Sequence, residues 1–103
     1  MAKGGYVYII TNANRTILYI GVTNNIKRRV YEHKYEVGSQ FTHKYNLTDL
    51  MFYDFFESIE EAILNEKKFK NRHRAWKYKL LKKNNPNMED LSKGWFDELD
   101  DLS

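Results

Sequence analysis

The chain has 103 residues, a mass of 12.4 kDa and a formal charge of +3, and 42% of its residues are hydrophobic. This length suits one domain with a single modest core, and the lack of cysteine excludes disulfides, thiolate zinc sites and cysteine nucleophiles. No apolar run approaches the ~18 residues of a membrane span, and the first residues lack the hydrophobic segment of a signal peptide. We therefore expect a soluble, cytoplasmic protein.

Charge is distributed unevenly along the chain. Residues 67–83 contain nine lysines or arginines and no acid, whereas residues 89–103 contain six acids and one lysine. We therefore predict one domain over residues 1–88, with a net charge of +8, followed by an acidic C-terminal tail over residues 89–103. A basic body favours a nucleic-acid partner, although solvated helix faces explain the basic cluster equally well. The candidate phosphate contacts are Lys67, Lys70, Arg72, Arg74 and Lys77.

Hydrophobic periodicity and turn residues predict six regular elements. Aromatic and β-branched residues mark the strands, an Asn-rich segment over residues 12–15 indicates a hairpin turn, and Ser58 with Glu61 forms a capping-box pattern. The order β-β-α-β-α-α predicts a small α+β domain, in which helices flank a three-stranded, mostly antiparallel sheet. In chain order we expect strands over residues 6–11 and 16–22, a helix over 26–37, a substrate-facing loop over 41–45, a strand over 50–56, and helices over 58–70 and 74–83.

The expected hairpin register brings two tyrosines together. If Tyr8 pairs with Tyr19 and Tyr6 pairs with Gly21, both Tyr8 and Tyr19 project from one face of the sheet, and Gly21 leaves that face open to a ligand. A shift of one residue would separate them, so the register is an assumption.

Other polar side chains could join these phenols. Arg29 and His33 are four residues apart on the first helix, so they share one side of it, and Glu66 is the last acid before the basic cluster. A carboxylate that holds a divalent ion, an arginine that binds the scissile phosphate, and a phenol or imidazole that moves a proton would suit phosphodiester hydrolysis. On spacing alone, each of these residues also has an ordinary structural explanation: core packing, a solvated face or an ion pair.

The motifs themselves resemble a known family. Tyr6-Val7-Tyr8 and Tyr19-Ile20-Gly21 are similar to the paired signature of the GIY-YIG nucleases, and Arg29 and His33 follow at the family's spacing. The segment over residues 61–66 resembles the one that ends in the family's metal-binding glutamate, here Glu66. The resemblance covers residues 5–83 and is closest to small standalone bacterial members, which are similar to the N-terminal nuclease domain found in the bacterial excinuclease.

The resemblance implies a metal-dependent endonuclease that hydrolyses DNA phosphodiester bonds, with a role in DNA repair or recombination. Mg²⁺ or Mn²⁺ would bind at Glu66. Tyr8 would act as the general base, with Arg29 and the metal lowering its pKa from the ordinary value near ~10. Tyr19 would help to order the site, and His33 would be a second proton carrier or would position water.

Two other functions stay open at this point. One is a nucleic-acid-binding module that keeps the fold but cleaves little or not at all, and the other is a protein-interaction adaptor, for which the acidic tail is the only support. Many family members also have an asparagine about a dozen residues after the glutamate, where this chain has Tyr78.

Overall fold

The structure is a computed structural model, and it describes residues 4–36 and 39–97. It confirms the predicted α+β class and the order of the six expected elements, and it adds one short helix, α2. The strands are β1 (Gly5–Thr11), β2 (Leu18–Thr23) and β3 (Asp49–Phe56), and the helices are α1 (Ile26–Tyr35), α2 (Gln40–Lys44), α3 (Ile59–Lys70) and α4 (Arg74–Asn84).

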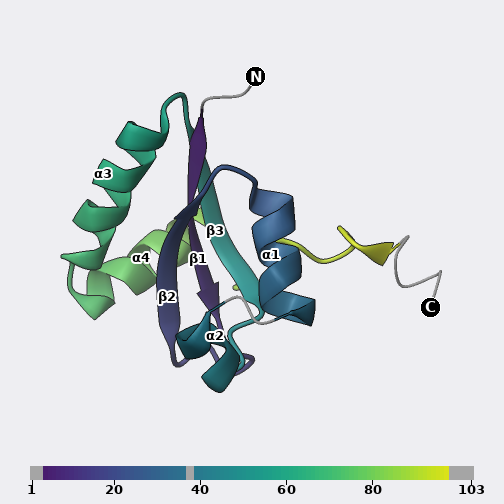
Figure 1. Ribbon diagram of the computed structural model, residues 1–103. Helices are drawn as coiled ribbons and strands as arrows, with labels where there is room; N and C mark the ends of the chain where they lie inside the picture. The colour runs from purple at the N-terminus through teal and green to yellow at the C-terminus, as the bar shows by residue number, and fades with distance from the viewer. Residues whose placement is uncertain (1–3, 37–38, 98–103) are drawn as a thin grey trace.

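The strands form an antiparallel sheet in the order β2-β1-β3, so the first strand lies at its centre. Successive side chains of β1 point to opposite faces, and each face carries its own core. Figure 1 shows α1 on one face of the sheet and α3 and α4 on the other. Tyr8 and Ile10 pack with the apolar residues of α1, while Val7 and Ile9 pack toward α3 and α4.

The hairpin register differs from the predicted one by two residues. Tyr8 lies opposite Gly21, and Tyr19 lies opposite Ile10, so the expected Tyr8–Tyr19 pairing is wrong. The loop sets this register: the Asn12 side-chain oxygen accepts hydrogen bonds from the backbone amides of Thr16 and Ile17, which delays the start of β2. Because the shift is an even number of residues, Tyr8 and Tyr19 still project from the same face.

Gly21 serves a different purpose from the one expected. A Cβ atom built on Gly21 would lie only 2.4 Å from the Tyr8 hydroxyl and 2.5 Å from its Cζ. The missing side chain therefore makes room for the Tyr8 ring, and does not leave that face of the sheet open to a ligand.

The first helix begins where the sequence predicted. Asn25 is its N-cap and accepts a hydrogen bond from the Arg28 amide. The helix ends at Tyr35, two residues before the predicted end, and its buried residues are Ile26, Val30 and His33. Val37, the last residue of the predicted helix, lies outside the described residues.

The short helix α2 replaces most of the loop expected over residues 41–45. Ser39 is its N-cap, and the Ser39 and Thr42 side chains each accept a hydrogen bond from the other residue's backbone amide. This reciprocal capping satisfies donors that a single helical turn would otherwise leave unpaired. The helix fixes the position of Thr42, which is buried.

The later elements agree with the prediction to within one residue at each end. The Ser58 side chain accepts a hydrogen bond from the Glu61 amide at the start of α3, as its capping pattern indicated. β3 pairs with β1 along its whole length, with a bulge beside Ile9 and Ile10. Within the described part of the chain, no helix is both long enough and apolar enough to cross a membrane.

The acidic segment contacts the body of the protein as far as residue 97. Asp90 accepts a hydrogen bond from the Leu50 amide and forms a 2.6 Å ion pair with Lys34 of α1. Trp95 and Phe96 pack against the core on the α1 face. From Asp90 to Phe96 the segment thus lies against β3 and α1, on the side away from α3 and α4 (Figure 1).

Candidate functional site

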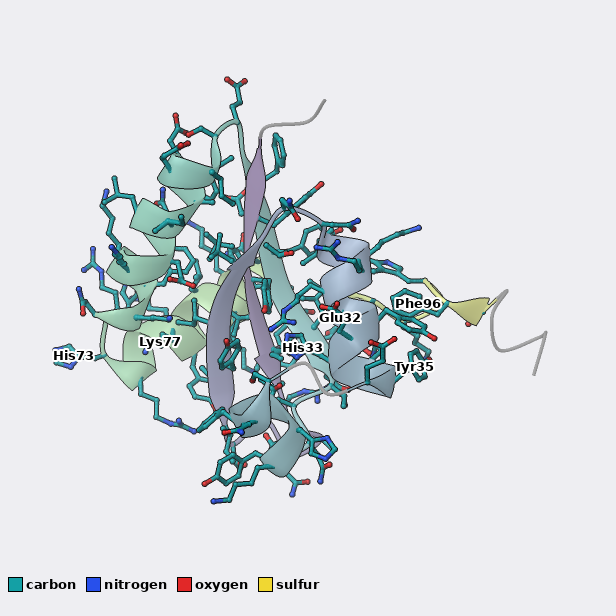
Figure 2. All side chains as sticks on the ribbon, viewed as in Figure 1. Glu32, His33, Tyr35, His73, Lys77 and Phe96 are labelled. Carbon is teal, nitrogen blue, oxygen red and sulfur yellow. The ribbon has the colours of Figure 1, made fainter. Side chains whose placement is uncertain are left out.

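Three of the predicted site residues meet at one hydroxyl group. The Tyr8 hydroxyl on β1 lies 3.0 Å from Nε2 of His33 and 3.3 Å from Nε of Arg29, both on α1. Figure 2 shows His33 pointing from α1 toward the sheet. Tyr8 is 1% exposed and His33 is 6% exposed, so this contact lies inside the protein. The four-residue spacing of Arg29 and His33 brings both side chains to Tyr8, as expected.

The hydrogen bonds fix the direction of each proton. Arg29 can only donate, so the Tyr8 oxygen accepts from it. The Thr42 hydroxyl donates to the Ser39 carbonyl and is therefore an acceptor toward His33. This leaves Nε2 of His33 to accept the Tyr8 proton. His33 then carries its proton on Nδ1 and donates it to Oγ1 of Thr42, 3.1 Å away. Both hydrogen-bonding directions of the Tyr8 hydroxyl are therefore used within the protein.

Burial dominates the electrostatics of this network. It raises the pKa of Tyr8 to about 12, even though the hydrogen bond and positive charge of Arg29 act in the opposite direction. Burial, together with the Arg29 charge, lowers the pKa of His33 to about 4, so the imidazole is neutral near pH 7. Arg29 alone thus does not bring the pKa of Tyr8 toward neutrality. The expectation that Arg29 and a bound metal together lower this pKa stays a prediction.

Arg29 is held at both ends of its guanidinium group. Its Nη1 donates to Glu32 at 2.9 Å, and its Nε donates to Tyr8. Burial would lower the pKa of Arg29, but the hydrogen bonds to Tyr8 and Glu32 raise it above the ordinary value. Arg29 is therefore a fixed cation, and its side chain is still 25% exposed.

Tyr19 lies beside this network and also faces solvent. Its ring centroid is 6.4 Å from that of Tyr8 and 6.0 Å from that of His33, and its outer side stacks on Phe41 of α2. Tyr19 and Phe41 line a cleft of about 270 Å³, together with Lys70 of α3 and Lys77 of α4. This cleft, which we call the β2-edge cleft, also includes Leu18 and Ile20.

Glu66 reaches the site from the other layer of the fold. It lies on α3, which packs against β1 and β2 on the face opposite α1 (Figure 1). Its carboxylate is near enough to contribute to the raised pKa of Tyr8. The Glu66 side chain is only 14% exposed, and Lys70, which lines the β2-edge cleft, is 3.5 Å from it.

These surroundings fit a weakly held divalent cation better than a structural metal. Among the described residues, no three His, Asp or Glu side chains converge as a metal-binding group. Mg²⁺ commonly binds through one or two carboxylates and keeps several waters and substrate oxygens. Glu66 matches this requirement, because its mostly buried carboxylate has a lysine as its only ionic partner in residues 4–36 and 39–97.

The predicted phosphate contacts are spread over α3 and α4. Lys70 and Lys77 line the β2-edge cleft beside Tyr19, whereas Lys67 is exposed on α3. Arg72 stacks on Trp76 at 5.0 Å, and Arg74 stacks on Tyr78 and donates hydrogen bonds to the Tyr78 hydroxyl and the Thr16 carbonyl. The structure therefore brings two of the five cations to the cleft.

Sequence reasoning missed Glu32, and it expected Phe41 and Thr42 only as part of a substrate-facing loop, without the contacts that they make. Glu32 follows Arg29 by three positions, a spacing that indicates a helix ion pair and could have identified it. Thr42 and Phe41 reach His33 and Tyr19 only because α2 folds back against these two residues. No local pattern indicates this packing.

The comparison with known proteins matches the part of the chain that contains this site. The profile of the GIY-YIG catalytic domain matches residues 4–79, which include the network around Tyr8 and the carboxylate of Glu66. The chain belongs to the GIY-YIG family. Within this family it is similar to the UPF0213 protein of Pediococcus pentosaceus, with 33% identity over 91 residues that cover 88% of this chain and 95% of the relative.

Two further relatives are similar over most of their length. The UPF0213 protein of Natronomonas pharaonis is 36% identical over 79% of this chain and 94% of its own. The UPF0213 protein of Clostridium perfringens is 31% identical over 85% of this chain and 94% of its own. No solved structure gives a significant match. The match spans most of the length of each of these relatives.

Proposed function

We propose that this protein hydrolyses phosphodiester bonds of DNA with the help of Mg²⁺ or Mn²⁺ bound at Glu66. The observation that carries the proposal is the β2-edge cleft, where Tyr19 meets Lys70, the ionic partner of Glu66. The Tyr19 ring lies next to that of Tyr8, which accepts a hydrogen bond from the fixed cation Arg29. The family match to residues 4–79 supports a nuclease-like function and a nucleic-acid partner. A role in DNA repair or recombination and a cytoplasmic location belong to the same proposal.

Each polar group has a role that follows from its surroundings. A divalent ion held by Glu66 would supply Lewis-acid stabilisation of the charge on the leaving oxygen. Arg29 is a preorganised cation and would stabilise the negative charge that develops on the scissile phosphate. The lysines of the cleft would bind neighbouring phosphates.

The burial of Tyr8 favours other roles for Tyr8 and Tyr19 than those that the family resemblance implied. The Tyr8 hydroxyl is inaccessible to water, its pKa is about 12, and it already donates to His33 and accepts from Arg29. Tyr8 and His33 would therefore position Arg29. Tyr19 faces the cleft, so its hydroxyl would orient the attacking water. The water oxygen would bond to phosphorus as the bond to the leaving oxygen breaks, and the water's proton would pass to solvent.

The test is plasmid or oligonucleotide cleavage by the purified protein with Mg²⁺ or Mn²⁺. We expect cleavage that chelation abolishes and that Glu66→Ala reduces to background. Glu60→Ala is the matched control, because it removes an exposed carboxylate from the first turn of the same helix. If Glu66→Ala cleaves as fast as the parent, the proposed site is wrong. If neither protein cleaves but both bind DNA equally, the binding-module function is correct.

A further inference from the structure

The exposed surface of α2 carries two aromatic side chains that neither core explains. Phe41, within the helix, is 46% exposed, and Tyr45, its C-cap residue, is 37% exposed. The centroids of the two rings are 4.8 Å apart. Neither belongs to the two apolar cores of the sheet. Both rings therefore gain less stabilisation from burial than a core ring does. Exposed rings of this kind are typical of a binding surface.

The two rings continue the site outward. Phe41 stacks on Tyr19 with 29° between the ring planes and 6.1 Å between centroids, and the Tyr45 ring lies 4.8 Å from that of Phe41, tilted by 53°. Tyr19, Phe41 and Tyr45 thus form a row of three rings, which we call the aromatic row. It leads from the network around Tyr8 to the exterior.

The charge of the β2-edge cleft suits a polyanion. Lys70 and Lys77 line the cleft on the α3 and α4 side, while Tyr19 and Phe41 line it on the other. Within residues 4–36 and 39–97, the Lys77 ammonium donates only a long, 3.4 Å hydrogen bond to the Lys70 carbonyl. Lysines that follow phosphates, beside aromatic rings on which bases stack, are the features of sites that bind single-stranded nucleic acid.

We propose that the aromatic row stacks unpaired bases of a nucleic-acid strand whose phosphates lie along Lys70 and Lys77. The bases of an intact duplex are stacked on each other, so their faces are hidden from the rings of Phe41 and Tyr45. The preferred ligand is therefore a strand with a single-stranded segment next to the phosphate at the catalytic site. This inference deepens the proposed function and rests on it only for the position of that phosphate.

The experiment measures binding in EDTA, so that it does not depend on cleavage. Fluorescence anisotropy compares the parent and Phe41→Ala on three labelled ligands: a single strand, an abasic strand with the same number of phosphates, and a duplex. We expect Phe41→Ala to weaken binding of the base-bearing strand about tenfold, the contribution of roughly one stacked base. Binding of the abasic strand should be unchanged, because it has no bases to stack.

Matched variants separate stacking from loss of fold and from charge. Phe55→Ala removes another ring, 50% exposed, from β3 at the opposite edge of the sheet, and should leave binding unchanged. Phe41→Tyr should restore binding. Lys77→Gln should weaken binding of the normal and abasic strands by the same factor, and by more than Lys82→Gln, which removes an exposed charge elsewhere on α4.

Three results would overturn the inference. The first is that Phe41→Ala binds the base-bearing strand as tightly as the parent does. The second is that Phe41→Ala weakens binding of the abasic strand as much as binding of the base-bearing strand, and the third is that Phe55→Ala weakens binding as much as Phe41→Ala does. A Lys77→Gln variant that binds like Lys82→Gln would overturn the phosphate path. Failure of the proposed function is recognised separately, as binding that depends on Phe41 in a protein that cleaves nothing when Mg²⁺ or Mn²⁺ is added.

Discussion

The Tyr8 hydroxyl donates its proton to Nε2 of His33 across 3.0 Å and accepts a hydrogen bond from Arg29. This contact joins the central strand to α1 in the interior of the protein. It requires a neutral imidazole, because protonation would place a second donor on Nε2 of His33, facing the Tyr8 proton, and leave a buried donor without an acceptor. The stability of the fold is therefore linked to the protonation of His33.

The first prediction is that stability falls on acidification. The pKa of His33 is about 4 in the folded protein, against ~6.5 when unfolded. The contribution of neutral His33 to the free energy of unfolding is complete above the unfolded pKa. It is lost as the pH falls from ~6.5 to ~4, because the unfolded state then binds more protons than the folded state. The loss is up to about 3 kcal/mol, measured as the free energy of unfolding in urea. His33→Gln should flatten this dependence, whereas His73→Gln, on an exposed residue (Figure 2), should not.

The second prediction concerns the fixed position of Arg29. Glu32→Ala removes one of its two hydrogen-bonding partners, so the guanidinium would no longer be held in one orientation. We expect the cleavage rate at saturating DNA to fall by roughly tenfold to a hundredfold, with little change in thermal stability. Glu36→Ala, at an exposed residue after the same helix, is the control. An unchanged rate would show that Glu32 does not position Arg29.

The third prediction tests the close packing of Tyr8 on Gly21. Gly21→Ala would force the Tyr8 ring to move, since the new Cβ would lie 2.4 Å from its hydroxyl. We expect a loss of about 1–3 kcal/mol in the free energy of unfolding, the usual cost of overpacking. In a Tyr8→Leu background the same substitution should cost less, because the colliding ring is absent. Equal losses in both backgrounds would contradict this packing.

The fourth prediction concerns the segment over residues 89–97. Burial would raise the pKa of Asp90, but hydrogen bonds from Lys34, Ser92 and Leu50 hold it below its usual value. The resulting stabilisation is present above the unfolded pKa of ~3.9 and is lost as the pH falls below it. Asp90→Asn should thus destabilise the protein near neutral pH and have little effect at strongly acidic pH. A penalty that is independent of pH would contradict a role for the Asp90 charge.

The sequence was sufficient for the fold because its signals were local. Alternating apolar residues, Asn25 and Ser58 as N-caps, and the position of Arg29 and His33 on one helix all act within a few residues. The hairpin register was not accessible in this way, because it depends on how the Asn12 side chain folds the loop. The pKa of Tyr8 also depends on burial by distant residues, which no local pattern records.

The sequence predicted which residues form the site better than it predicted how they are arranged. The spacing of its motifs identified the residues that meet at Tyr8, but Glu66 belongs to a helix on the opposite face of the sheet. The contacts of Phe41 and Thr42 with the site follow from the packing of α2, a five-residue helix. The pattern that indicates this helix is the reciprocal capping of Ser39 and Thr42. The accessibility of Tyr19, and the inaccessibility of Tyr8, are consequences of packing.

The most direct test of the account is single-turnover cleavage by Tyr19→Phe and Tyr8→Phe in Mn²⁺ or Mg²⁺. Each substitution removes one hydroxyl and keeps the ring. We predict that the parent cleaves DNA and that Tyr19→Phe is slower by about a hundredfold or more, with unchanged DNA affinity. Tyr8→Phe should be affected less and should also lose stability, because His33 and Arg29 lose a buried partner. A parent that cleaves no DNA, or a Tyr19→Phe variant that cleaves as fast as the parent, would contradict the account.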